Sequence, residues 1–410
     1  MLSEIRGYPL RVFGICFVAY SFAQMDLALF GYAIPFIREE FGLTLSGVMS
    51  IVSSAFLLGG GLLVVLGVLG DRIGRLRMFQ FSVLTSSLLV ALHSIVPNPF
   101  SLVLLRGASI ATGGLSYPIT GAIITEEFPA HGRGLFMGLL QIGYPLGWAI
   151  ASLWAMWILP IYGWRALFLV GLLSLPLILV VSKWVREPPR YKAAKDQLSP
   201  RPIRELFSAS MRHRTIILFS AQFLFVWAYS ASIFLFPSYL REFRGMEAFD
   251  FALVIGAGNA IGILGYILAA LVGEYLLSRR NTVVIWTVIG AVLFELMIWT
   301  TESFWEILAV YSFMSMFFYG SAAVKFAYLA EVFPTYIRST AMTFCGSGAV
   351  VLGSAAGPYC VSLAVEQWGW TLGYATLVGV PLLMAGLLYL ALMPIPSGLE
   401  VEDIQNYFNR

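Results

Sequence analysis

The chain has 410 residues, of which 59% are hydrophobic and only 11% are charged. A soluble protein of ordinary composition has about 25% charged residues, so most of this surface must contact something other than water. The net charge of +3 gives no reason to expect a nucleic-acid partner. Cys16, Cys345 and Cys360 all fall in apolar segments without metal-ligand spacing, so neither a metal nor another cofactor is expected.

Long apolar segments, separated by Gly, Pro and charged residues, run through the whole chain. A membrane span needs roughly 20 apolar residues, and it must be helical because lipid offers the backbone no hydrogen-bond partners. The pattern therefore predicts an all-α membrane protein with twelve transmembrane helices. In chain order, the predicted spans are 11–37, 47–69, 77–97, 100–125, 134–158, 164–184, 215–240, 250–276, 281–300, 304–330, 338–365 and 370–393.

The basic residues indicate how these spans are oriented. Most of the 25 Lys and Arg residues fall in alternate loops, whereas the opposite loops carry mainly Arg38, Arg165, Arg241 and Arg244. Basic loops stay on the cytoplasmic side, so both termini are predicted to be cytoplasmic. We expect a monomeric, multi-pass protein of a prokaryotic plasma membrane, with the lipid bilayer and a small-molecule substrate as its partners.

The longest polar stretch, residues 186–214, divides the predicted spans six and six. It is too short for a folded domain and is typical of a solvated linker. The predicted organisation is an N-terminal six-helix bundle over 1–185, a cytoplasmic linker over 186–214, and a C-terminal six-helix bundle over 215–410 that ends in a short cytoplasmic tail.

The two halves share sequence features at a nearly constant offset. Residues 126–133 and 331–338 both read Glu-x-Phe-Pro-x-x-x-Arg, and the pair Gly-Trp occurs at 163–164 and again at 369–370. Two matches in the same order indicate a duplicated six-helix unit. Such a repeat predicts two pseudo-symmetric bundles with a substrate cavity between them.

Residues 67–75 read Gly-Val-Leu-Gly-Asp-Arg-Ile-Gly-Arg, between the second and third predicted spans. This segment matches Gly-x-x-x-Asp-Arg-x-Gly-Arg, so the chain resembles the major facilitator superfamily of transporters over essentially its whole length. The corresponding loop of the second half, 273–280, lacks the Asp. The resemblance implies a transporter that works by alternating access.

The signature loop has the chemistry of a gate on the cytoplasmic side. Asp71 can accept hydrogen bonds at a helix N-terminus, and Arg72 and Arg75 can pair with Glu126 or Glu127. Such pairs would hold the cytoplasmic ends together and break on opening; alternatively, the arginines only set the topology. The predicted gate residues are Asp71, Arg72, Arg75, Glu126, Glu127, Arg133, Glu331 and Arg338.

Within the superfamily, the chain is similar to the branch of sugar porters and of organic-anion, aromatic-acid and sugar-acid symporters. The similarity rests on Asp26 in the first span, Arg106 in the fourth, the repeated Glu-x-Phe-Pro loops, and Arg-Glu-Pro-Pro-Arg-Tyr at 186–191. It implies a proton-coupling role for Asp26 and Arg106. Some sugar-acid symporters have a second carboxylate two turns after the Arg, where this chain has Gly113.

The same two residues stand out on physical grounds, because ionisable groups inside a bilayer are costly and usually functional. Asp26 paired with Arg106 stays ionised, whereas an isolated Asp in an apolar interior takes up a proton. Protonation would therefore free Arg106 for an anionic substrate. The alternatives are a purely structural pair, or an Asp that caps a break in the first span.

Lys325 in the tenth span is a further charge inside the predicted bilayer region and can bind a substrate carboxylate. Alternatively, it pairs with Glu331 or extends to the cytoplasm. Gln141 lies at the offset where sugar porters place a substrate-binding Gln. Further candidates at mid-span depth are Tyr117, Tyr144, Gln222, Trp227, Tyr229, Asn259 and Tyr319, although each aromatic could equally serve helix packing.

These features predict a proton-coupled symporter for a small organic anion, such as a carboxylate or sugar acid, or for a sugar-like solute. The paired glutamines of true sugar porters in the seventh span are missing, which disfavours a sugar. A proton-driven antiporter or exporter and an uncoupled facilitator remain alternatives. An enzyme or sensor is disfavoured because the sequence shows no catalytic triad, metal cluster or nucleotide-binding loop.

Overall fold

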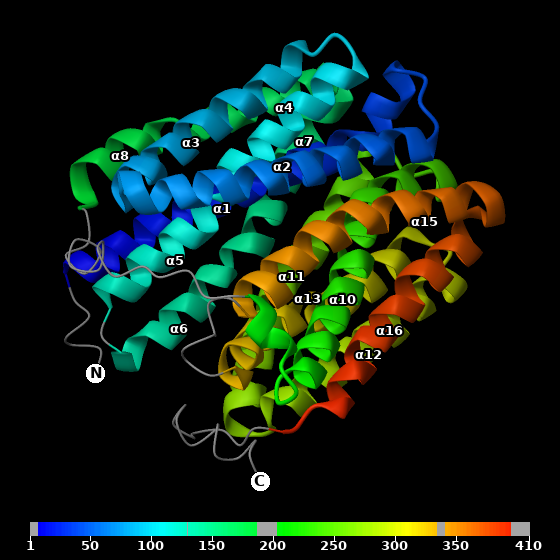
Figure 1. Ribbon diagram of the computed structural model, residues 1–410. Helices are drawn as coiled ribbons and strands as arrows, with labels where there is room; N and C mark the ends of the chain where they lie inside the picture. Colours follow the sequence, from blue (N-terminus) through cyan, green and yellow to red (C-terminus); the bar gives the residue numbers. More distant parts are fainter. Residues whose placement is uncertain (1–6, 129, 187–202, 334–340, 395–410) are drawn as a thin grey trace. The chain divides into compact units, whose positions relative to one another are not determined.

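The computed structural model describes residues 7–128, 130–186, 203–333 and 341–394, and throughout these ranges the regular structure is helical. The chain divides into two compact units (Figure 1). Unit 1 comprises Met1–Ser199 with Met246–Gly256, and unit 2 comprises Pro200–Gly245 with Ala257–Arg410. Most of the predicted linker, 187–202, lies outside the described residues, so the predicted boundaries around it stay a prediction.

Unit 1 begins with long helices and continues with shorter ones. Its elements are α1 (Tyr8–Glu40), α2 (Leu45–Ile73), α3 (Arg75–Leu92), η1 (His93–Ile95), α4 (Pro99–Gly114), α5 (Ser116–Glu127), α6 (Ala130–Gln141), α7 (Gly143–Phe168), η2 (Leu169–Ser174) and α8 (Pro176–Trp184).

Unit 2 also combines long helices with short π or 3-10 segments. Its elements are η3 (Ile203–Phe207), α10 (Arg212–Ser238), η4 (Tyr239–Phe243), most of α11 (Ala248–Tyr275), α12 (Arg279–Thr300), α13 (Phe304–Val332), η5 (Met342–Gly348), α15 (Ala349–Tyr374), η6 (Ala375–Gly379), α16 (Val380–Leu388) and η7 (Tyr389–Ala391).

The described residues contain 9 helical segments that are long and apolar enough to cross a membrane. Two of them are about twice the usual length: Phe136–Trp184 has 49 residues and Met342–Ala391 has 50. Each contains one glycine with non-helical backbone angles, Gly163 (φ 74°) and Gly369 (φ 81°). The chain therefore turns at these glycines, which are the two predicted as equivalent positions of the repeat.

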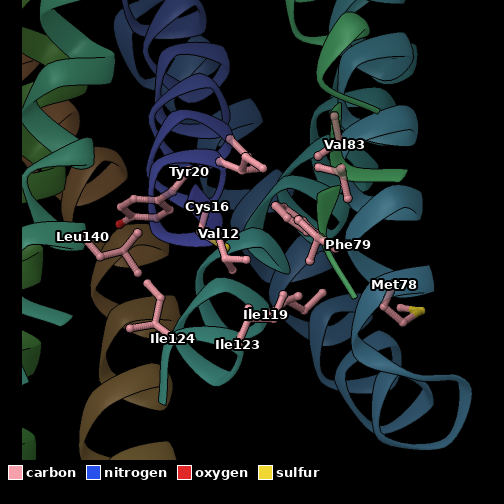
Figure 2. Close-up of a cluster of buried hydrophobic side chains, with 14 of the residues drawn as sticks. Val12, Cys16, Tyr20, Met78, Phe79, Val83, Ile119, Ile123, Ile124 and Leu140 are labelled. Atoms are coloured by element: carbon pink, nitrogen blue, oxygen red, sulfur yellow. The ribbon is translucent and has the colours of Figure 1, made fainter. Parts of the chain in front are cut away.

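Each unit has its own apolar core. In unit 1, side chains of α1, α3 and α5 meet, among them Val12, Cys16, Phe79 and Ile123 (Figure 2). In unit 2, the corresponding cluster draws on α10, α12 and α13 and includes the buried rings of Tyr328 and Tyr389. These cores leave apolar side chains such as Val64, Leu179, Leu264 and Val292 exposed, as expected for helices that face lipid.

The two units repeat the same helix contacts. In unit 1, α1 packs on α7 and α3 on α4; in unit 2, α10 packs on α15 and α12 on α13. Glycines bring further helix pairs together. A Cβ on Gly59 of α2 would lie 2.8 Å from the carbonyl oxygen of Gly107, and a Cβ on Gly320 of α13 would lie 2.5 Å from that of Gly265. Small residues thus allow close helix crossings in both units.

The turn glycines lead to a stability prediction. No atom lies within 4 Å of a Cβ built on Gly163 or Gly369, so the positive φ alone requires glycine. An L-residue with this φ costs about 1–2 kcal/mol. Gly163→Ala and Gly369→Ala should each lower the thermal unfolding midpoint measured in detergent. Gly61→Ala is the matched control, because Gly61 has equally open space but no positive φ; an equal loss in the control would contradict the explanation.

Candidate functional site

Asp26 on α1 and Arg106 on α4 both lie in the interior of unit 1, with exposed fractions of 4% and 2%. The structure therefore brings together the two charges that the sequence singles out. They interact electrostatically. However, no ion pair within 4.0 Å joins these two described residues, so the contact is not a direct salt bridge.

Arg106 is held by α1 in another way. Its Nη2 donates a hydrogen bond of 2.9 Å to the main-chain carbonyl of Leu27. Its guanidinium carbon lies 4.3 Å from the centre of the Phe30 ring, which is a cation–π distance. Leu27 and Phe30 thus hold the Arg106 side chain, which was expected to bind Asp26.

The Asp26 carboxyl group lies where α1, α3 and η2 meet. Its Oδ1 is buried, and it has no hydrogen-bond partner among the described residues. A Cβ on Gly171 of η2 would lie 2.7 Å from Val90 and 3.4 Å from Asp26 Oδ1, so the site exists only because residue 171 is a glycine. An unpartnered carboxylate oxygen in an apolar interior is costly and favours a bound proton or a cation.

Further predicted residues of unit 1 lie on α5, α6 and α7. Gln141 donates a hydrogen bond of 3.0 Å to the hydroxyl of Tyr117, so two of the predicted binding residues are in direct contact. The Tyr117 ring lies beside Tyr20 of α1, with centroids 5.5 Å apart. Tyr144 stacks on Trp148, at 6.4 Å. All three predicted residues are half-buried.

In unit 2, an aromatic cluster surrounds the predicted residues Tyr229 and Tyr319. The ring centroids of Tyr229 lie 5.9, 5.8 and 5.2 Å from those of Phe225, Phe318 and Tyr319, respectively. The hydroxyl of Tyr319 is 2.9 Å from that of Tyr311. α10 and α13 together form this cluster.

Lys325 of α13 extends into the same cluster and is only 3% exposed. Its Nζ lies 2.7 Å from the centre of the Phe225 ring. Within the described ranges, this ammonium has no hydrogen-bond partner and forms no ion pair. The alternative pairing with Glu331 is not present, because Glu331 pairs with Arg279.

The remaining predicted binding residues of unit 2 differ in how they are used. Gln222 and Asn259 are buried on α10 and α11, with exposed fractions of 8% and 1%. The indole N–H of Trp227 donates to the carbonyl of Leu377 at 2.9 Å. This bond joins α10 to η6, so Trp227 has a packing role in the arrangement described here.

The predicted gate is visible only in part. The side chains of Asp71, Arg72, Glu126 and Arg133 and the whole of Arg338 lie outside the described residues. The backbone at Asp71 belongs to the last turn of α2, and Gly74, with φ 118°, precedes α3. The final glycine of the signature loop is therefore required by its backbone conformation, and the gate pairs of unit 1 stay a prediction.

In unit 2, the loop that lacks the Asp still carries an ion-pair network. Arg279 pairs with Glu274 at 2.7 Å and also with Glu331, which belongs to the second Glu-x-Phe-Pro loop. One arginine thus links the end of α11, the start of α12 and the end of α13. Glu274 thus pairs with an arginine although this loop lacks the Asp of the signature.

His93 is a buried residue that the sequence reasoning did not select. It opens η1 and its side chain is fully buried, beside Phe168 and Phe30. A signal was present, because the chain has only 3 His residues and this one falls inside a predicted span. An ionisable residue inside a span is a functional candidate.

Comparison with known proteins gives three consistent results. Residues 16–274 match the Major Facilitator Superfamily. The cis,cis-muconate transport protein of Acinetobacter baylyi is 28% identical over 366 residues, which cover 83% of this chain and 84% of that protein. The gallate transporter of Pseudomonas putida is 24% identical, over 94% of this chain and 92% of that protein.

A solved structure with a similar fold is a bacterial homolog of the human lysosomal transporter Spinster, in an inward-facing and occupied conformation. It superimposes with a TM-score of 0.69 and covers 98% of this chain and 97% of that one. At 15% sequence identity, this likeness supports the fold and nothing finer.

The isolated ammonium of Lys325 leads to a second stability prediction. Leaving a buried polar group without a partner costs about 1–3 kcal/mol, and Met can pack on the Phe225 ring without that cost. Lys325→Met should therefore raise the thermal unfolding midpoint by several degrees. Arg279→Met is the control and should lower the midpoint, because Arg279 has two carboxylate partners. A lower midpoint for Lys325→Met would mean that Lys325 contributes to stability.

Proposed function

The chain belongs to the Major Facilitator Superfamily, and we propose that it is a proton-coupled symporter of a small organic acid. It is a multi-pass membrane transporter and not an enzyme. Proton coupling, symport and the class of substrate are the proposed parts. The observation that carries them is the buried pair of Asp26 and Arg106, in which the two charges lie close together without a direct bond.

The proton switch follows from what each member of this pair needs. With Arg106 bound to the Leu27 carbonyl, the unpartnered Oδ1 of Asp26 is best satisfied by a proton. If Arg106 turns toward Asp26, the carboxyl group can release that proton and form a salt bridge. Substrate binding competes for the same guanidinium. We infer that proton and acid are taken up together for this reason.

The proposed substrate class rests on two kinds of support. The named relatives are transporters of cis,cis-muconate and of gallate, which are both organic acids. Among the described residues, Arg106 in unit 1 and Lys325 in unit 2 are buried basic side chains without a bonded carboxylate. The Phe30 face beside Arg106, and the Phe225 ring with the neighbouring phenol of Tyr229 beside Lys325, suit a small, unsaturated carboxylate. We therefore assign Arg106, Gln141, Tyr117, Tyr229, Tyr319 and Lys325 as the principal substrate-binding candidates.

We also propose twelve spans with cytoplasmic termini and transport by alternating access. Dividing each of the two long helical segments at its glycine turn, and counting α4 with α5 as one further span, turns the 9 apolar segments into twelve. The predominance of Lys and Arg in alternate loops supports cytoplasmic termini. The Arg279 network supports a cytoplasmic gate at the ends of α11 and α13.

Transport into proteoliposomes with an imposed pH gradient tests the proposal. Wild-type protein should accumulate labelled cis,cis-muconate or gallate when the outside is acidic, and it should not accumulate glucose. Asp26→Asn should abolish accumulation but retain exchange of labelled for unlabelled acid, because exchange requires no net proton movement. Accumulation that survives in Asp26→Asn would refute the assignment of Asp26. Uptake that requires protons to leave the vesicle would show an antiporter. Uptake that does not depend on the pH gradient would show a facilitator.

The role of Lys325 can be tested separately by binding. Lys325→Gln removes the positive charge but keeps a hydrogen-bond donor, so it should weaken binding of the transported acid by tenfold or more in a calorimetric titration. Lys183→Gln, on the last turn of α8, removes a charge outside the proposed site and serves as control. Unchanged affinity in Lys325→Gln would remove this residue from the binding site.

A further inference from the structure

His93 combines full burial with an unused polar atom. Its Nδ1 lies 2.7 Å from the carbonyl oxygen of Leu89. A carbonyl oxygen can only accept, so Nδ1 must carry the hydrogen, and in the neutral ring Nε2 is left with a lone pair. This Nε2 is buried, and among the described residues it has no hydrogen-bond partner. The ring is therefore held in the tautomer that can accept a proton at Nε2.

The His93 ring is fixed by two aromatic neighbours, and one of them also contacts Arg106. It stacks on Phe168 at 4.9 Å and contacts the edge of Phe30 at 6.3 Å. The Arg106 guanidinium lies over the same Phe30 ring, and Arg106 interacts electrostatically with His93. A guanidinium near the ring disfavours a second positive charge there, so movement of Arg106 changes how readily His93 can become a cation.

Asp26 and His93 contact the same two parts of unit 1, the end of α3 and the segment from Phe168 to Gly171, about one helical turn apart. Val90 and Gly171 lie beside the Asp26 carboxyl group, and Leu89 and Phe168 hold the His93 ring. Residues three or four apart in these helical segments are neighbours on one face. The two unpartnered atoms, Asp26 Oδ1 and His93 Nε2, thus belong to residues on the same buried face.

Apart from Asp26 and Arg106, the charged residues near η1 are remote from the His93 ring or are paired. η1 packs against α3, α4 and α7. The charged residues of these elements, with the nearest ones of α1, are Arg75 and Arg77 at the opposite end of α3, Arg106 on α4, Arg165 on α7, and Asp26 and Glu40 on α1. Arg165 pairs with Glu40 and donates to the carbonyl of Val96, so its charge is compensated. Among the described charged residues that contact this region, Arg106 has no carboxylate bonded to it.

We propose that His93 is a second proton-carrying group of the transport cycle, in addition to Asp26. The proton, taken from water, adds to the lone pair of Nε2 when Arg106 leaves Phe30 for the substrate, and it returns to water when Arg106 moves back. The Phe168 ring then stabilises the imidazolium through a cation–π contact. This inference rests on the proposed proton coupling, and it supplies the second acid–base group that is missing at Gly113.

Imidazole ¹⁵N NMR tests the link between His93 and Arg106 without any substrate. The chain has 3 His residues, so replacing His131 and His213 by Gln leaves His93 as the observed signal. At pH 6, Arg106→Gln should raise the ratio of protonated to neutral His93 by tenfold or more, because a nearby positive charge has been removed. An unchanged ratio would overturn the proposal and leave His93 as a packing residue. Native His93 is kept throughout, so a folding defect of a His93 variant cannot obscure the result.

Proton counting in proteoliposomes then tests the role in transport. His93→Gln should lower the number of protons carried per acid and remove one ionisation step from the pH profile of uptake. His213→Gln, at the exposed start of α10, is the matched control and should leave both unchanged. If wild type carries no protons, the proposed function itself is wrong. If wild type is coupled and His93→Gln has the same stoichiometry and profile, only the role of His93 is refuted.

Discussion

The hydrogen bond from Arg106 to the Leu27 carbonyl determines how the polar interior of unit 1 is arranged. Because the guanidinium bonds to the main chain of α1 and lies over Phe30, it does not neutralise Asp26. Arg106, the unpartnered Oδ1 of Asp26 and the unpartnered Nε2 of His93 therefore lie in the same buried interior of unit 1. No member of this group can change its protonation or position without altering the electrostatic energy of the other two.

Much of the architecture could be predicted because it depends on periodic or repeated features. Apolar segments, the signature loop and the repeated Gly-Trp pairs led to a helical membrane protein of the Major Facilitator Superfamily, which is confirmed. The site was harder, because side-chain contacts depend on tertiary packing. Asp26 and Arg106 could be selected as buried charges, but the bond of Arg106 to Leu27 depends on the depth and rotation of two helices. The pairing of Glu274 with Arg279 depends on the reach of the arginine side chain and not on a motif.

The two units use buried charge differently although they repeat the same helix contacts. In unit 1, Arg106 interacts electrostatically with Asp26 and His93, whereas in unit 2 Lys325 packs against the Phe225 ring. In the function proposed above, the first unit supplies the proton-coupling groups and the second contributes Lys325 to substrate binding. Burying the Lys325 side chain without a partner is expected to cost stability, which is consistent with a residue retained for binding.

The glycine turns at 163 and 369 also bear on the ancestry of the chain. Their space is open, so side-chain packing did not select glycine there; the backbone conformation did. A constraint of this kind is independent of the solute and of the coupling ion, and it would persist in both copies after a gene for a single half was doubled. The buried charges Asp26, Arg106 and Lys325 differ between the halves, and they record how the copies diverged from two equal parts into two specialised ones.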